Sequence, residues 1–350
     1  MSAPWGSRSG PDWFERLMGF RESDYEATQK RLVVESDELM STVNSRRYGC
    51  GNLSLPTLAE LRERVEAGGM QRSTVISVVG DARALHAEPE FAGAQFQVAS
   101  QFNLLEMVGP RVRPEDGVAR YAGDPTQGPA CAMAAGAATI YRNYCVPVGG
   151  EVGQRSHRQL DALAHLGIAL SSELGQPVDA LWTMQNGYAL CTGQGLNAIG
   201  NLLASAGDDL RDTLRGQLAI GLHRNVEVTD VTEVPPRKVS QAFCSALPVA
   251  YSALPESAWE SFARLVLEAA YEATLLAAAE QAASGGSNTV LLTRLGGGAF
   301  GNADAWIDDA MRRALTVVEH AGLDIRVVSY GSVNPSGRTI VEEWSNHNGK

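Results

Sequence analysis

The sequence predicts an α/β fold in which helices cover both faces of a mostly parallel or mixed central sheet. Short β-branched segments, bounded by glycine or polar residues, have the length and composition of buried strands. Longer segments with apolar residues at helical spacing separate several of them, most clearly in the last third of the chain. One strand also leads through a glycine-rich loop directly into a helix. This succession is typical of a parallel sheet with helical crossovers.

Two parts of the chain are distinguished by their patterns. Residues 1–70 are expected to form an N-terminal helical extension packed on the core, and residues 71–350 the α/β domain. Thr57 and Glu60 have the spacing of a capping box. The helix that they begin is expected to end at Gly68.

The first strands of the α/β domain are expected at Ser73–Val79 and Ala94–Ala99, which are apolar runs that end in polar residues. A loop rich in Pro, Gly and Asp follows at Arg111–Gln127. An Ala-rich helix is then expected over Gly128–Tyr144, with Pro129 suited to its first turn.

The middle of the chain, about residues 147–232, is expected to be an insertion into the main sheet. It contains a predicted helix at Gln159–Leu174 and a possible strand at Val226–Val231.

The last third has the clearest pattern. A capping box at Ser257 and Glu260 begins a long helix. Asn302 is expected to cap a second helix that Gly322 ends. Strands are expected at Val239–Leu247, Thr289–Leu295 and Ile325–Ser329.

The composition excludes several classes of function. The formal net charge of −11 argues against a nucleic-acid duplex as partner, because phosphate backbones are bound by clustered Lys and Arg. The 350 residues contain five widely spaced cysteines, without a C-x-x-C pair, and six scattered histidines without an H-x-x-x-H pair. No signal peptide or membrane span is predicted. We therefore expect a cytoplasmic protein with no metal or other cofactor, whose oligomeric state is left open.

The glycine-rich loop between a strand and a helix predicts a phosphate site. Gly296-Gly297-Gly298-Ala299-Phe300-Gly301 combines positive-φ flexibility with free N–H groups at a helix start. A tight turn is the simpler alternative. The loop also fits G-x-G-x-x-G, but the acidic residue that a dinucleotide site places after the next strand is absent. No Walker-type sequence occurs.

Four segments combine these features in one order along the chain, namely Val78–Asp81, Gln97–Asn103, Gly128–Ala130 and Leu295–Gly301. In that order they resemble the ligand-binding segments of a macrodomain, the ADP-ribose-binding α/β fold. The chain is about twice as long as a minimal macrodomain. The resemblance therefore implies an elaborated, divergent bacterial member of the superfamily. The tandem-Glu signature of poly(ADP-ribose) glycohydrolases is absent from the expected loop.

The resemblance implies ADP-ribose or an ADP-ribosylated substrate as the partner. Asp81 would accept from the adenine amino group, the loop with Asn103 would meet the distal ribose, and Phe300 would lie against that ribose. The expected ligand-binding residues are Asp81, Ala82, Gln101, Gly128, Gly296, Gly297, Gly298, Ala299, Phe300, Gly301, Asn302, Tyr330 and Asn334.

Hydrolysis of an N- or O-glycosidic ADP-ribosyl bond needs an oriented ribose, a positioned water and an acid or base. Asn103 is the candidate for orienting the ribose. Glu106, Asp116 and Asp124 are candidates for activating water, although each is also explained as a solvated loop charge.

Three other functions remain open from the sequence. The first is a module that binds ADP-ribose without turnover. The second is a thiol hydrolase that uses Cys131, whose place in a first helical turn would lower its pKa; a small core cysteine is the simpler alternative. The third is a Rossmann oxidoreductase.

Overall fold

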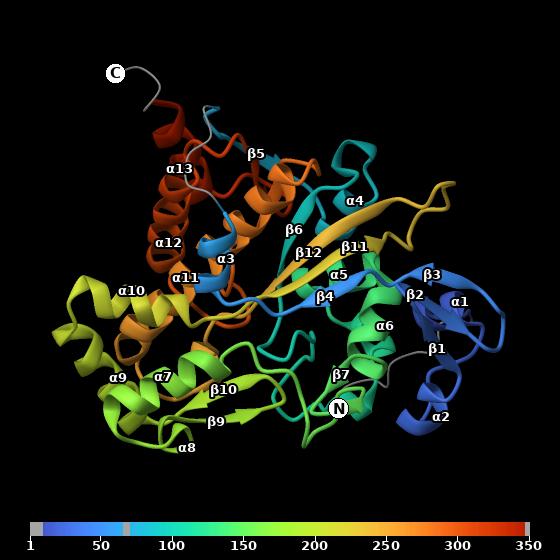
Figure 1. Cartoon of the computed structure of the whole chain (residues 1–350), viewed down its shortest axis with the longest axis horizontal. Coiled ribbons are helices and arrows are strands. Elements are labelled where there is room, and N and C mark those ends of the chain that lie inside the picture. The colour runs from blue at the N-terminus through green and yellow to red at the C-terminus, as the bar shows by residue number, and fades with distance from the viewer. Residues whose placement is uncertain (1–9, 66–70, 347–350) are drawn as a thin grey trace, which may run out of the picture.

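A mixed seven-stranded sheet forms the centre of the molecule (Figure 1). The computed structural model describes residues 10–65 and 71–346. The strand order is β4 (Asn52–Ser54), β11 (Gly221–Glu227), β12 (Lys238–Cys244), β6 (Gln95–Ala99), β13 (Thr289–Leu292), β14 (Asp324–Ser329) and β5 (Thr74–Val79). The five strands from β12 to β5 are mutually parallel, and β11 runs antiparallel to both of its neighbours.

Helices cover both faces of this sheet, which confirms the predicted fold class (Figure 1). One face carries α3 (Leu58–Arg64), α11 (Glu256–Ala283), α12 (Asp304–Val317) and α13 (Pro335–Asn346). The other carries α4 (Ala82–His86), α5 (Gln127–Ala134) and α6 (Gly136–Tyr144). Helix α11 is buried over most of its length because it lies between the sheet and other helices, so its apolar residues are not confined to one stripe.

The N-terminal region is not the helical extension that the sequence predicted. It has two short helices, α1 (Trp13–Met18) and α2 (Tyr25–Gln29), together with a three-stranded sheet. The strands of that sheet are β1 (Leu32–Glu35), β2 (Glu38–Ser41) and β3 (Arg47–Gly49). The next strand, β4, joins the central sheet beside β11. Short alternating strands of this kind carry a weak sequence signal, which the prediction missed.

The middle region contains two hairpins and four helices. The hairpins are β7 (Pro147–Val148) with β8 (Glu151–Val152), and β9 (Trp182–Gln185) with β10 (Tyr188–Cys191). The helices are α7 (Ala164–Leu174), α8 (Val178–Leu181), α9 (Gly193–Ser205) and α10 (Asp208–Gly216). The predicted limit at residue 232 lies too late, because β11 already belongs to the central sheet. The strand expected at Val226–Val231 is thus shifted toward the N-terminus.

Several predicted helix starts and ends are corrected. The capping box of Thr57 and Glu60 is confirmed, with N–H to side-chain distances of 3.2 and 2.8 Å. Gly68, the expected end of that helix, lies outside the described residues. Helix α11 instead begins after Pro255, whose lack of an N–H group suits a helix start, and Glu260 pairs with Arg264.

The other corrections concern helices near the glycine-rich loop. The helix expected over Gly128–Tyr144 is divided at Ala135, and its first half begins at Gln127 rather than beside Pro129. Asn302 does not cap α12, because its amide nitrogen donates to the carbonyl of Leu247 at 2.8 Å. That helix ends at Val317, before the predicted Gly322. None of the described helices has the length and apolar character required to cross a bilayer.

Candidate functional site

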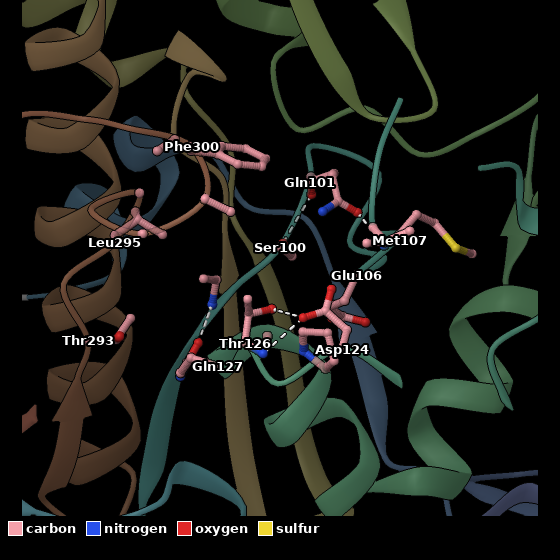
Figure 2. Close-up of a pocket in the computed structure, with 18 of the residues that line it drawn as sticks. Ser100, Gln101, Glu106, Met107, Asp124, Thr126, Gln127, Thr293, Leu295 and Phe300 are labelled. Atoms are coloured by element: carbon pink, nitrogen blue, oxygen red, sulfur yellow. Dashed lines mark hydrogen bonds between the residues drawn. The ribbon is translucent and has the colours of Figure 1, made fainter. Parts of the chain in front are cut away.

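A cavity of about 340 Å³ lies where β6, β12 and β13 end. Its lining residues come mainly from 99–108, 123–129 and 293–300. In Figure 2 the loop with Thr293, Leu295 and Phe300 forms one wall, and Gln101, Glu106 and Met107 lie opposite it. In open α/β sheets ligands bind at the carboxyl ends of the strands, and this volume is within the usual range for small-molecule sites.

The glycine-rich loop offers an anion-binding surface to this cavity. The structure gives no acceptor, among the described residues, to the N–H groups of Gly298, Ala299 and Phe300. Positive φ angles of 76° at Gly296 and 70° at Gly301 shape the loop, as the sequence predicted. Successive free N–H groups at such a turn form a concave site for phosphate oxygens.

Neighbouring side chains hold this loop in place. The hydroxyl of Tyr271, on α11, accepts from the N–H of Leu295 at 2.9 Å and donates to the carbonyl of Thr293 at 2.6 Å. Asn302 closes the loop, since its N–H donates to the carbonyl of Gly296 at 2.9 Å. Gly297, Gly301 and Asn302 shape the loop without lining the cavity, whereas Gly296, Gly298, Ala299 and Phe300 line it.

Arg294 is the only cationic residue among those that line the cavity, and it is already paired. Its guanidinium donates to Asp308 at 2.5 Å and to Asp304 at 2.6 Å. An anion in the cavity would therefore be held by backbone N–H groups rather than by a free positive charge.

Gln127 and Gly128 hold the first turn of α5 against the end of β6. The amide oxygen of Gln127 accepts from the N–H of Ala99 at 2.9 Å, and its amide nitrogen donates to the carbonyl of Gln97 at 3.0 Å. Strand β6 pairs with β13 through two residue pairs, at Val290 and Leu291. Beyond them, the side chain of Gln127 takes the place of β13 as hydrogen-bond partner of the β6 backbone. The prediction included Gly128 and missed Gln127. The sequence feature that could have indicated Gln127 is its position between a Pro- and Gly-rich loop and the start of a helix.

Glu106 is the sequence-predicted carboxylate that the structure buries in the cavity wall, with 2% exposure. Its Oε1 lies 3.5 Å from Nη2 of Arg142, and its Oε2 is buried with no hydrogen-bond partner in the described part of the chain. Its backbone N–H donates to the hydroxyl of Tyr121 at 3.0 Å. Burial raises the pKa of this carboxyl to about 7, although the positive charge of Arg142 acts in the opposite direction. A carboxyl group with such a pKa exchanges protons readily near neutral pH.

The other predicted catalytic residues are placed differently. Asn103 is buried away from the cavity, and its side chain bonds to the N–H of Leu105 and to Gln159. Asp116 pairs with Arg113 and does not line the cavity. Asp124 does line it, with Oδ1 accepting from the backbone N–H and the hydroxyl of Thr126 at 2.9 and 2.6 Å (Figure 2).

The residues expected to contact adenine lie outside this cavity. Asp81 caps α4 by accepting from the N–H of Ala84 at 3.0 Å, and Asn334 accepts from the N–H of Gly337 at 3.1 Å. Tyr330 is 82% exposed. Ala82 borders a second hollow of only about 10 Å³, which Gln127 also borders.

Gln101 and an aromatic cluster complete the walls. The side-chain oxygen of Gln101 accepts from the N–H of Met107 at 2.8 Å. The rings of Tyr188, Tyr251 and Phe300 lie with centroids 5.1 to 5.6 Å apart. Tyr188 comes from the β9–β10 hairpin, so the middle region contributes to the site. The sequence contained no signal for that contribution.

Cys131 does not have the environment of a nucleophile. It is fully buried and does not line the cavity, and burial raises its pKa well above the ordinary value. The expected lowering by the helix start is therefore wrong, because desolvation outweighs the dipole. In the described part of the chain, neither His86 nor His157 forms a hydrogen bond with its sulfur. Among the described residues, no group of His, Cys, Asp and Glu is arranged to hold a metal ion.

Comparison with known proteins gives structural matches only. No family model and no curated protein matches the sequence. The chain is similar to poly(ADP-ribose) glycohydrolase from Deinococcus radiodurans in complex with ADP-ribose, with 13% identity, a TM-score of 0.43, and coverage of 85% of this chain and 95% of that one. It is also similar to the enzyme from Thermomonospora curvata, with 13% identity, a TM-score of 0.44, and coverage of 91% and 95%.

Proposed function

We propose that the protein binds ADP-ribose or a close derivative in the 340 Å³ cavity and hydrolyses an ADP-ribosyl bond. One observation carries this proposal. Glu106 lies in the wall opposite the glycine-rich loop (Figure 2). Among the residues that the structure describes, one oxygen of Glu106 and three consecutive N–H groups of the loop have no partner. A ligand that combines a diphosphate with a glycosidic bond could place the diphosphate at the loop and the glycosidic bond beside Glu106.

The diphosphate would bind at the glycine-rich loop. The N–H groups of Gly298, Ala299 and Phe300 would donate to its oxygens, as expected of a turn with free N–H groups. Within residues 10–65 and 71–346, the first N–H groups of α5, at Gln127 and Gly128, also have no acceptor. These two sets of donors explain how a protein of net charge −11 can hold two phosphates.

Glu106 would act as the general base. Its ionised carboxylate would take a proton from water while the water oxygen attacks the anomeric carbon of the distal ribose. The bond between that carbon and the acceptor oxygen or nitrogen breaks, the acceptor takes a proton from solvent water, and Glu106 afterwards returns its proton to solvent. Asp124, whose Oδ2 has no partner among the described residues, is proposed to assist in orienting the water.

The adenine end would extend past the cavity toward β14 and β5. Asp81 follows β5 and Tyr330 follows β14, and these two strands are parallel neighbours, with Ser329 beside Val79. Asp81, Ala82, Tyr330 and Asn334 would therefore lie near one another at the same sheet edge. We assign the base to this edge, with the exposed ring of Tyr330 available to cover it.

A binding module without turnover is the second candidate. The observation that favours it is the complete burial of Oε2 of Glu106, which has less than 1 Å² of accessible surface. Attack by water requires access to this atom, whereas ligand binding does not.

Two measurements test the proposal. Calorimetric titration with ADP-ribose should give micromolar binding that AMP, ADP and NAD do not equal, and Gly298→Val should abolish it. Release of ADP-ribose from ADP-ribosylated protein should occur with the wild type and be lost in Glu106→Gln with affinity retained. Binding without release in the wild type would leave the binding module. Absence of ADP-ribose binding would overturn both candidates.

A further inference from the structure

Arg142 is a buried cation that contacts the loop carrying Glu106 at two points. Its side chain is fully buried on α6. Nε donates to the carbonyl of Leu104 at 3.0 Å, and Nη2 lies 3.5 Å from Oε1 of Glu106. Leu104 has a positive φ of 62°, which a bulky residue adopts only when its surroundings enforce it. The guanidinium therefore binds both the backbone and the functional side chain of one strained loop.

The rest of the guanidinium is held from other elements. Nη2 also donates to the hydroxyl of Thr139 at 3.1 Å, and Nη1 lies 3.3 Å from Nδ1 of His223 on β11. The ring of Phe243, on β12, lies 3.9 Å from Cζ. Burial and the charge of Arg142 together keep the pKa of His223 well below its ordinary value, so this ring is neutral and accepts through Nδ1. The planar group is thus fixed before any ligand arrives.

The charged and titratable neighbours of Glu106 are few. Arg142 on α6 is the cation beside it, and Tyr121, in the 3₁₀ turn Ala119–Gly123, contributes a neutral hydroxyl. Cys131 on α5 is a buried neutral thiol, and Asp124 lies on the same cavity. Among these groups, only Arg142 stabilises the ionised carboxylate by its charge.

We infer that Arg142 is a positioning residue for Glu106: it holds the loop and Oε1, and thereby sets the orientation of the carboxylate that takes the proton from water. This inference rests on the proposed function. The separation of 3.5 Å between Nη2 of Arg142 and Oε1 of Glu106 is long for a charge-assisted hydrogen bond. The guanidinium therefore orients the carboxylate without forming a tight ion pair with it. The charge of Arg142 also opposes the effect of burial on the pKa of Glu106, so both protonation states are accessible near neutral pH.

The experiment measures the ionisation of Glu106 directly. Infrared difference spectra of wild type against Glu106→Gln isolate its protonated carboxyl band, which should titrate with a midpoint near 7. In Arg142→Met the carboxylate loses its cation, so the midpoint should rise by about 1–3 pH units. Arg142→Lys keeps the positive charge but not the planar guanidinium. In this variant the midpoint of the Glu106 titration should stay close to the wild-type value, while the orientation of the carboxylate is lost.

Kinetics separate this role from a structural one. Release of ADP-ribose by Arg142→Met should show kcat reduced by about tenfold to a hundredfold. KM should change little, and the fall of activity on the acid side should move to higher pH. Arg215→Met is the matched control, since Arg215 is largely buried and pairs with Asp212 and Glu268 away from the cavity. It should lower the melting temperature without moving either midpoint.

The outcomes are distinct for the two proposals. An unchanged infrared midpoint in both Arg142 variants would overturn the inference, whatever the activity. If Arg142→Met shifts the midpoint of Glu106 while the wild type releases no ADP-ribose, the coupling of Arg142 to Glu106 is supported and the proposed hydrolase activity is ruled out. If Arg142→Met does not fold, Arg142→Lys is the test: a reduced kcat with an almost unchanged pH profile would support the inference, and an unchanged kcat would overturn it.

Discussion

Gly128 makes room for Glu106. A Cβ atom at position 128 would lie 3.1 Å from Cγ of Glu106 and 2.1 Å from the carbonyl oxygen of Ala99. Real Cβ atoms do not approach a backbone oxygen so closely, and a carbonyl in a sheet cannot move aside. The first turn of α5 is therefore packed against the side chain of Glu106 so closely that no side chain fits at position 128.

Gly128→Ala should accordingly be destabilising and should disturb the site. We expect a loss of about 1–3 kcal/mol in the free energy of unfolding, as for overpacked cores. ADP-ribose release should also be lost. Gly200→Ala is the control, because position 200 lies within α9 with no atom within 4 Å of the added Cβ. That change should stabilise by about 0.5–1 kcal/mol. Chemical denaturation measures both, and an unaffected Gly128→Ala would contradict the close packing.

The stability of the protein should depend on the ionisation of Glu106. Its pKa is raised from 4.5 to about 7 in the folded state, so the folded protein binds this proton more tightly than the unfolded chain. This contribution is fully present below pH 4.5 and is lost as the pH rises through 7. Wild type should therefore lose about 3 kcal/mol over this interval relative to Glu106→Gln. Parallel pH curves of the two proteins would show that Glu106 has an ordinary pKa.

His86 should have the opposite effect on stability. It is buried on the ring of Phe96, at 3.7 Å between centroids, and burial lowers its pKa to about 4. The unfolded chain binds this proton more tightly, so stability should fall as the pH decreases from 6.5 to 4. His86→Gln should remove this part of the acid sensitivity. Thermal melts over this pH interval make the comparison, and equal acid slopes would be evidence against a neutral His86.

The glycines of the glycine-rich loop should differ in their tolerance of a side chain. Gly296 has a φ of 76°, and an added Cβ would lie 2.4 Å from Cβ of Ala246. Gly296→Ala should cost about 1–2 kcal/mol from the backbone alone and should weaken ADP-ribose binding. At Gly298 an added Cβ has no neighbour within 4 Å, so Gly298→Ala should keep the stability. Denaturation curves with calorimetry distinguish the two, and equal stability losses would be unexpected.

Removing the amide of Gln127 should uncover the edge of β6. Gln127→Ala leaves the N–H of Ala99 and the carbonyl of Gln97 without partners, which should cost about 1–3 kcal/mol. Gln127→Glu should cost more, because a carboxylate oxygen then faces the carbonyl of Gln97. A Gln127→Glu variant as stable as the wild type would mean that water replaces the side chain. Hydrogen exchange at Ala99 is the direct measurement.

The sequence predicts the fold better than the site. Strands β5, β6, β12, β13 and β14 were expected within a few residues of their observed bounds, because each is a short apolar run that ends in a glycine or polar segment. The N-terminal sheet and strand β11 were missed or shifted. Their short alternating segments acquire a defined register only by pairing with strands far away in the chain.

For the site, local pattern located the glycine-rich loop and listed Glu106 among several carboxylates. It did not single out Glu106, because its burial depends on Arg142, which lies on another element. The aromatic contribution of Tyr188 was invisible for the same reason. Asn103 was expected in the cavity, yet its amide is needed to hold the backbone of Leu105. Distinguishing these roles requires long-range contacts that spacing does not encode.

The cavity is lined mainly by residues 99–129 and 293–300, which follow the neighbouring strands β6 and β13. Between α11 and β13 the chain passes through an exposed turn at Gly285 and Gly286. A break at this turn would leave the buried carboxyl group of Glu106 on one fragment and the glycine-rich loop on the other. Neither fragment alone would hold the ligand. ADP-ribose would thus stabilise the association of the two fragments, and its binding would show that they have reassembled.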